Sequence, residues 1–94
     1  MDLFNVVSEG NFIYLKKEGD LKKDNIYDIM EYLRDFSETV GTRKNIIIDF
    51  ENSRFLDFTL TEIYGEILNI FRKKGILKVG IKKPMVNDSL DGVT

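Results

Sequence analysis

The sequence contains no cysteine and no histidine, and these absences exclude much chemistry. Without cysteine there is no disulfide and no thiol nucleophile. Without histidine the chain lacks the commonest general base and metal ligand, and it cannot act in a histidine phosphorelay. We also find no glycine-rich phosphate loop, no nucleophile with a base at a recognisable spacing and no paired carboxylates. The sequence therefore predicts a protein that is not an enzyme, with no catalytic residue, cofactor or metal.

Long apolar runs and strong charge of one sign are also missing. No stretch approaches the roughly 18 apolar residues of a membrane span, and the first ten residues lack the basic start of a secretory signal. The 14 Lys and Arg are scattered among 16 Asp and Glu, so no face for a nucleic acid is expected. We therefore predict a cytoplasmic protein without a membrane span.

The 94 residues, of which 43% are hydrophobic, suit one small domain with a single core. We place this domain at residues 1–83. The remaining residues, 84–94, are polar and predict a tail or the stub of a truncated helix.

Four apolar segments are typical of strands. Residues 3–7 and 12–15 flank turn-forming residues and predict a β-hairpin. Residues 46–50, with three consecutive isoleucines, predict a central strand. Residues 76–81 predict a last strand, which Pro84 follows.

Two segments have the apolar spacing of a helix with one buried face. The first covers about residues 25–40, with Asp24 or Asn25 as its N-cap and Gly41 in the left-handed conformation that ends a helix. The second covers about residues 60–74 and stops at Gly75. The resulting order of strands and helices predicts an α/β fold with about four strands. In this mixed sheet the hairpin is antiparallel, the later strands are parallel, and both helices lie on one face.

The start of the second helix carries the most informative motif. Thr59 and Glu62 have the spacing of a capping box, in which each residue's side chain accepts a hydrogen bond from the other's main-chain N–H group. The free N–H groups and positive dipole end of such a helix start suit an anion, either a carboxylate or a phosphate.

The stretch "NIIIDFENSRFLDFTLTEIYGEILNIFRKKGILKVGI" resembles the centre of a STAS domain, the family of anti-sigma-factor antagonists and sulfate-transporter tails. The resemblance extends over about residues 3–82. Asp49 matches the end of the family's central strand, Thr59 its phosphorylated hydroxyl position, and Lys74 with Gly75 its helix end. Upstream, residues 19–21 resemble the family's turn between the second strand and the first helix. The family's last strand and helix region is missing or shortened here, which leaves an apolar sheet edge open to a partner or to a homodimer.

The resemblance implies a small regulatory domain that binds a serine/threonine kinase of anti-sigma type. Phosphorylation of Thr59 by this kinase would then release the partner. The candidate partner-binding residues lie at the start of the second helix: Asp57, Phe58, Thr59, Leu60 and Glu62. Phe58 stands where the family has a small hydroxyl residue, and Leu60 where it has glycine.

Each of these residues also has a purely structural interpretation. Thr59 can serve only as an N-cap, and Asp57 only as a match for the helix dipole. Phe58 is either a plug in the core or an exposed interface anchor. Gly65, inside the second helix, indicates either a close approach by another backbone or a tolerated glycine.

Two rival functions follow from the same stretch. In the first, Phe58 and Leu60 form a constitutive apolar interface, and the chain is a STAS-like scaffold subunit of a larger complex that is not phosphorylated. In the second, Asp49 is the phosphorylated aspartate of a response-regulator receiver. A receiver also requires an acidic pair after its first strand, but the first strands here end in Ser8 and Lys16, so the receiver is disfavoured.

Overall fold

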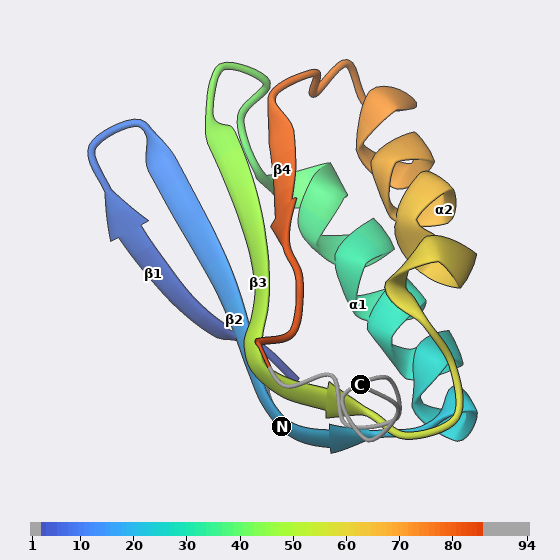
Figure 1. The fold of residues 1–94 in the computed structure, drawn as a ribbon. Helices are drawn as coiled ribbons and strands as arrows, with labels where there is room; N and C mark the ends of the chain where they lie inside the picture. The colour runs from blue at the N-terminus through green and yellow to red at the C-terminus, as the bar shows by residue number, and fades with distance from the viewer. Residues whose placement is uncertain (1–2, 86–94) are drawn as a thin grey trace.

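The structure, a computed structural model, describes residues 3–85 of the chain as two helices and a four-stranded sheet (Figure 1). Along the chain, the elements follow the predicted order of strand, strand, helix, strand, helix and strand. They are β1 (Asn5–Glu9), β2 (Phe12–Leu21), the short 3-10 helix η1 (Lys23–Asn25), α1 (Ile26–Thr39), β3 (Asn45–Phe55), α2 (Leu60–Arg72) and β4 (Val79–Lys82).

The strands lie side by side in the order in which they occur in the sequence. β1 and β2 form the predicted antiparallel hairpin, while β3 runs parallel both to β2 and to β4. The register between β2 and β3 shifts at Lys17, where β3 has a bulge, because Phe50 and Glu51 of β3 both lie opposite this one residue of β2. The buried Ser53 hydroxyl donates to the Lys17 carbonyl oxygen at 2.7 Å, so this carbonyl keeps a hydrogen bond in spite of the bulge.

Both helices lie on the same face of the sheet, as predicted (Figure 1). The alternation of a strand sends Ile46, Ile48 and Phe50 of β3 toward the helices, and all three are fully buried. They meet buried side chains of both helices, and the rings of Phe36 in α1 and Phe71 in α2 lie edge to face at 6.5 Å. The single core predicted from the composition therefore fills the space between the sheet and the helices.

The end of α2 confirms the prediction for Gly75. This residue has a φ of 79°, which only glycine adopts without strain. Its N–H group donates to the Arg72 carbonyl at 2.9 Å, and the Ile76 N–H group donates to the Phe71 carbonyl at 3.0 Å. These two bonds form a Schellman motif, and the buried Phe71 and Ile76 supply its apolar contact.

Two predictions at the ends of α1 need correction. Gly41 does not take the left-handed conformation, because the helix already ends at Val40, whose backbone is extended. Asn25 is the N-cap residue, but its side chain makes no capping bond to α1. Its carboxamide oxygen instead accepts the Lys22 N–H group at 2.8 Å, which closes the 3-10 turn in front of the helix.

The strands also differ from the predicted ranges. β2 and β3 extend well beyond their apolar runs, because their polar halves pair with each other from Glu18 to Leu21 and from Asn52 to Phe55. Asp49 therefore lies inside β3 rather than at its end, and residues 19–21 belong to β2 rather than to a turn. β4 starts at Val79, three residues later than predicted, because Ile76 belongs to the Schellman motif.

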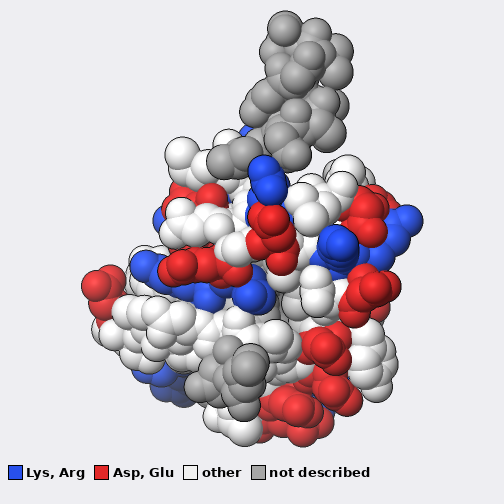
Figure 2. Space-filling model, turned by 90° about the horizontal axis from the view of Figure 1, so that it is seen from below, with Lys and Arg blue, Asp and Glu red and all other residues white. Residues whose placement is uncertain are grey.

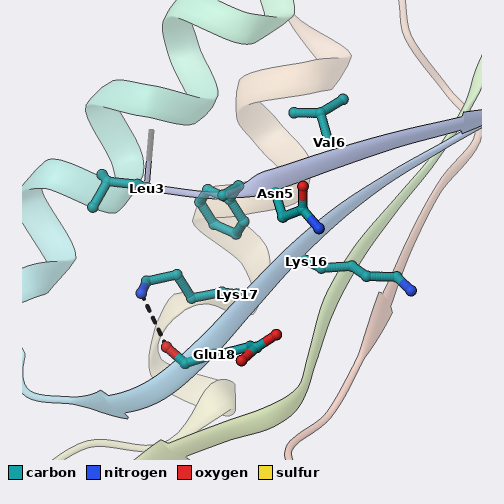
Figure 3. Close-up of a pocket in the computed structure, with 7 residues that line it drawn as sticks. Leu3, Asn5, Val6, Lys16, Lys17 and Glu18 are labelled. Carbon is teal, nitrogen blue, oxygen red and sulfur yellow. Dashed lines mark hydrogen bonds between the residues drawn. The ribbon is translucent and has the colours of Figure 1, made fainter. Parts of the chain in front are cut away.

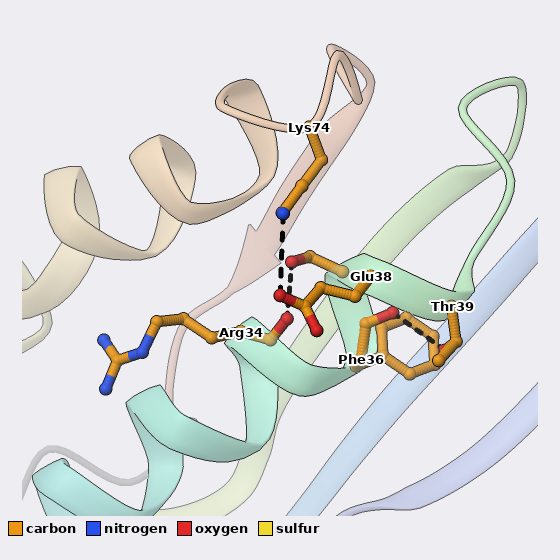
Figure 4. A network of polar contacts seen from close by, with 6 residues as sticks. Arg34, Phe36, Glu38, Thr39 and Lys74 are labelled. Atoms are coloured by element: carbon orange, nitrogen blue, oxygen red, sulfur yellow. Dashed lines mark hydrogen bonds and ion pairs between the residues drawn. The ribbon is translucent and has the colours of Figure 1, made fainter.

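The C-terminal ends of the two helices are linked by an ion pair. Lys74 Nζ, just after α2, lies 3.5 Å from a carboxylate oxygen of Glu38 in α1 (Figure 4). In the same turn of α1, the Ser37 hydroxyl donates to the Arg34 carbonyl and the Thr39 hydroxyl donates to the Phe36 carbonyl. Because Lys74 and Glu38 are both largely exposed, the pair contributes at most about 1 kcal/mol.

The predicted C-terminal tail lies mostly outside the described residues. Of residues 84–94, only Pro84 and Met85 are described. The Met85 N–H group donates to the Glu51 carbonyl at 3.2 Å, so the chain passes along the edge of β3 after leaving β4.

Candidate functional site at the start of helix α2

Thr59 lies at the N-cap of α2 with an extended backbone, as the motif predicts. The capping box with Glu62 is present. The Glu62 carboxylate accepts the Thr59 main-chain N–H group at 2.8 Å and also the Thr59 hydroxyl at 3.2 Å. The hydroxyl is exposed, so the one phosphorylatable group predicted for this turn lies at the surface and against a carboxylate.

Asp57 joins the approach to α2 to the start of α1. Its carboxylate accepts the Lys23 N–H group at 2.7 Å, although the two residues are 34 positions apart. Directly before it, the Leu56 N–H group donates to the Leu21 carbonyl at 2.9 Å. A carboxylate at the first N–H groups of η1 and α1 is favoured by the positive end of the helix dipole. Asp57 therefore fixes the loop that carries Thr59 to the other helix.

Phe58 is buried, with only 6% of its surface exposed. Its ring stacks on Phe55 with 4.4 Å between the centroids, and Phe55 meets Phe50 edge to face at 5.2 Å. Of the two alternatives for this residue, the structure shows the core plug. Phe58 thus anchors the turn to the core, and its ring is not available to a partner.

An apolar strip continues from the turn along the outside of α2. Leu60 is half-buried, Tyr64 is 45% exposed and Leu68 is half-buried, and each follows the previous one by four residues, so all three share one side of the helix. Before the turn, Leu56 is 40% exposed. Sequence reasoning missed Tyr64 as a surface residue, because it fits the apolar pattern of the helix, and it assigned no surface role to Leu56.

Taken together, the five predicted residues come from one continuous turn but face different ways. Thr59 and Glu62 bond to each other at the surface, whereas Asp57 points to η1 and Phe58 points into the core. Figure 2 views the molecule from below, and on this face acidic side chains gather toward one side. The visible face carries no continuous basic surface, which agrees with the charge pattern of the sequence.

Gly65 has open space beside it. A Cβ atom built on this residue would meet no heavy atom within 4 Å outside its own helix. The close approach within the fold that a mid-helix glycine can indicate is therefore absent from the part of the chain that the structure describes.

Replacing Gly65 with alanine is expected to raise the free energy of unfolding by about 0.5–1 kcal/mol, because alanine has the higher helix propensity and no neighbour obstructs its methyl group. Urea denaturation of the two proteins measures this difference. Gly75→Ala is the matched control. It should destabilise, since Gly75 has a positive φ. An equal effect of the two substitutions would contradict the prediction.

Replacing Thr59 with alanine is expected to lower the free energy of unfolding by about 1 kcal/mol while leaving the fold intact, as the loss of an N-cap side chain does. Chemical denaturation with circular dichroism as the readout measures the change. Thr61→Ala is the control, since Thr61 is also exposed but lies inside the helix. An unchanged midpoint for Thr59→Ala would mean that its hydroxyl does not stabilise the helix start.

Other hollows on the described surface offer less chemistry. One of about 480 Å³ lies beside Lys17, where the register between β2 and β3 shifts, and is lined by residues Leu3 to Val6 and Lys16 to Glu18 (Figure 3). The Lys17 ammonium beside it donates to the Glu18 carbonyl at 3.1 Å. The lining contains no serine, threonine or tyrosine hydroxyl. Among residues 3–85, no group of acidic side chains could hold a metal ion.

No protein-family model matches the chain, and no curated protein matches it either. None of the helices in residues 3–85 is long and apolar enough to cross a bilayer.

Eight chains among the solved structures are similar to this one, and three of them are described here. A structure of Mglu shares 17% identity over 85% of this chain and 19% of its own, with a TM-score of 0.57. A structure of Mglu in its native form shares 14% identity over 84% of this chain and 23% of its own, with a TM-score of 0.58. The chain thus spans about a fifth of the length of these proteins, and the likeness is one of fold. An antisigma-factor antagonist, a STAS domain from Rhodobacter sphaeroides, shares 23% identity over 85% of this chain and 86% of its own, with a TM-score of 0.45.

Proposed function

We propose that this chain is a small regulatory interaction domain of STAS type. It binds a protein partner, a serine/threonine kinase of anti-sigma type, through the start of α2, and phosphorylation of Thr59 releases that partner. The proposal includes a cytoplasmic location, where ATP is available to the kinase. It assigns no catalysis to the chain itself.

The observation that carries the proposal is the position of Thr59. Its hydroxyl is exposed at the N-cap, while the residues before it are tied down by the hydrogen bond of Asp57 to Lys23 and by the burial of Phe58. A kinase needs an accessible hydroxyl, and a partner needs a surface of defined shape. The turn at Thr59 meets both requirements, because Asp57 and Phe58 hold its backbone in place while Thr59 is exposed.

The apolar strip on α2 supports the same site. Leu60 and Tyr64 continue outward from Thr59 on one side of the helix, and partly exposed aromatic and aliphatic side chains are typical anchors of an interface. The proposed docking surface therefore consists of Leu56, Thr59, Leu60, Glu62 and Tyr64. Asp57 and Phe58 act in it as positioning residues.

The constitutive scaffold remains the second candidate, and the same apolar strip favours it. In that case Leu60 and Tyr64 would form the interface, because the ring of Phe58 is buried. The two candidates differ only in whether Thr59 changes its chemical state.

Incubation with ATP and a serine/threonine kinase of anti-sigma type that binds the chain tests the proposal. We expect the intact mass to rise by one phosphate, and peptide mapping to place this phosphate on Thr59. Thr59→Val should abolish the modification, whereas Thr61→Val, with a neighbouring exposed hydroxyl removed, should retain it. If the kinase modified only Thr61, or bound the chain without modifying it, the switch at Thr59 would be rejected and the constitutive scaffold would be favoured.

A further inference from the structure

The face of the sheet opposite the helices is uncovered by any described helix (Figure 1). The strand register sorts its outward side chains into rows that run across all four strands. The middle row is apolar and consists of Val7, Tyr14, Ile47 and Gly80, each paired with the next across neighbouring strands. We call this face, with the rows on either side, the open face.

Polar rows flank the apolar row. On one side, Glu9 of β1 pairs with Phe12 of β2, and Phe12 pairs with Asn45 of β3. Lys78 lies beside this row, because its carbonyl accepts the Ile46 N–H group. The row on the other side of the apolar row consists of Asn5, Lys16, Asp49 and Lys82, which the register pairs across the four strands.

Aromatic side chains extend the apolar surface along β2. Phe12 is 43% exposed, and its ring stacks on Tyr14 with 6.2 Å between the centroids. The ammonium of Lys16 lies 6.0 Å from the centre of the Tyr14 ring on the next row. In the edge strand β4, Gly80 has no side chain of its own, and the Cδ1 atom of Ile47 lies 3.3 Å from the position that a Cβ atom of Gly80 would take.

The charges on the open face balance. Three lysines, at positions 16, 78 and 82, stand against Glu9, Asp49 and, just beyond the third row, Glu51, which pairs with Lys82 at 3.9 Å. Asp49 is buried, and its carboxylate accepts the Glu51 N–H group at 2.8 Å. A strongly charged partner, such as a nucleic acid, therefore finds no complementary field. A surface with balanced and separated charges can instead complement a second copy of itself.

We propose that the open face binds a second copy of this chain, with the two-fold axis parallel to the strands. Such an axis places β1 over β4 and β2 over β3 of the second copy. Tyr14 then lies over Ile47, and Val7 lies over Gly80, which the Ile47 side chain of the same copy partly covers. In one flanking row Glu9 faces Lys78, so opposite charges meet there. In the other row Lys16 lies over Asp49, which is buried and makes no direct contact across the dimer. Face-to-face sheets cross by about 30°, and the long lysine side chains can span the resulting offset.

The size of the open face sets the strength of this dimer. Four strands about 4.8 Å apart and three rows about 6.7 Å apart cover roughly 19 by 20 Å. This area is below that of a standard interface of about 800 Å² per partner. We therefore expect a weak and reversible dimer that forms only at high protein concentration.

Sedimentation velocity of the full chain, from about 10 μM to 1 mM, tests the dimer. Glu9→Lys should weaken association at least about tenfold, because two like-charged pairs then face each other in every dimer. Lys78→Glu should do the same, and the double variant Glu9→Lys/Lys78→Glu should restore the wild-type constant. Glu66→Lys, on the exposed side of α2, is the matched control and should change nothing.

Ile47→Lys provides an independent test, because it places a charge in the centre of the apolar row and should abolish association. Circular dichroism checks that each variant is folded. A chain that stays monomeric at the highest concentration overturns the proposal. So does a dimer that Ile47→Lys leaves intact, or one that the double charge reversal fails to rescue. The open face and the start of α2 lie on different faces, so this result is independent of partner binding at Thr59.

Discussion

Replacing Phe58 with alanine is expected to lower the free energy of unfolding by about 3–5 kcal/mol, as truncation of a buried phenylalanine does. The ring is 6% exposed and stacks on Phe55, so its removal leaves a cavity beneath the start of α2. Small domains have total stabilities of about 5–15 kcal/mol, so much of the population could unfold. Urea denaturation followed by circular dichroism measures the effect.

Leu56→Ala is the matched control for Phe58. Leu56 lies two residues earlier and is 40% exposed, so its truncation should cost much less. Phe58→Leu keeps most of the apolar volume and should give an intermediate loss with a folded protein. If Phe58→Ala cost no more than Leu56→Ala, the ring would lie at the surface, and Phe58 would again be a candidate interface anchor.

The large effect expected for Phe58 follows from its place in a chain of aromatic contacts. Tyr32 of α1 meets Phe4, Phe4 meets Phe50, Phe50 meets Phe55, and Phe55 meets Phe58. The centroid distances in this chain are 4.4 to 6.1 Å. The start of α2 is thereby connected through the core to α1. A cavity at Phe58 would disturb the position of Thr59 as well as the stability of the fold.

Local signals in the sequence were sufficient to predict α2 and both of its ends. Thr59 with Glu62 predicts the start and Gly75 the end, because a capping box and a left-handed glycine are built from residues close in sequence. The same reasoning failed at Gly41. A glycine after a helical pattern permits a left-handed end but does not require one, and here Val40 leaves the helix with an extended backbone.

Features that depend on distant residues could not be predicted. The apolar run of β3 ends at Phe50, yet the strand continues to Phe55, because the polar end of β2 pairs with it. The bond between Asp57 and Lys23 joins two loops 34 residues apart, and neither loop carries a signal for the other. For Phe58, sequence reasoning left two alternatives open, since an aromatic residue in a turn can face the core or the solvent. Only the packing against Phe55 distinguishes them.

Phosphorylation of Thr59 is expected to weaken partner binding by about 3 kcal/mol, or more than a hundredfold. The phosphate adds about −1.5 to −2 charges at neutral pH. It replaces the proton that the Thr59 hydroxyl shares with the Glu62 carboxylate at 3.2 Å. A partner docked against this turn would have to bury the new charge without a pairing cation, which is costly.

The fold itself should tolerate the phosphate. The carboxylate of Glu62 would be repelled from the Thr59 N–H group, and the phosphate oxygens can accept that N–H group and its neighbours at the helix start. The burial of Phe58 and the bond from Lys23 to Asp57 involve neither group and would hold the turn in place. The circular dichroism spectrum and the denaturation midpoint should therefore change little.

Calorimetric titration of the partner with unmodified and fully phosphorylated protein measures the predicted loss. Thr59→Glu should reproduce part of it, because it adds one negative charge at the same place. Thr61→Glu is the control for charge alone, since it adds the same charge two residues later on the exposed helix surface and should have a smaller effect. Equal affinities of the unmodified and phosphorylated forms would reject the switch and favour the scaffold, in which the surface around Leu60 and Tyr64 binds its partner constitutively. A loss of affinity that Thr61→Glu matches in full would assign the effect to general repulsion rather than to Thr59 at the interface.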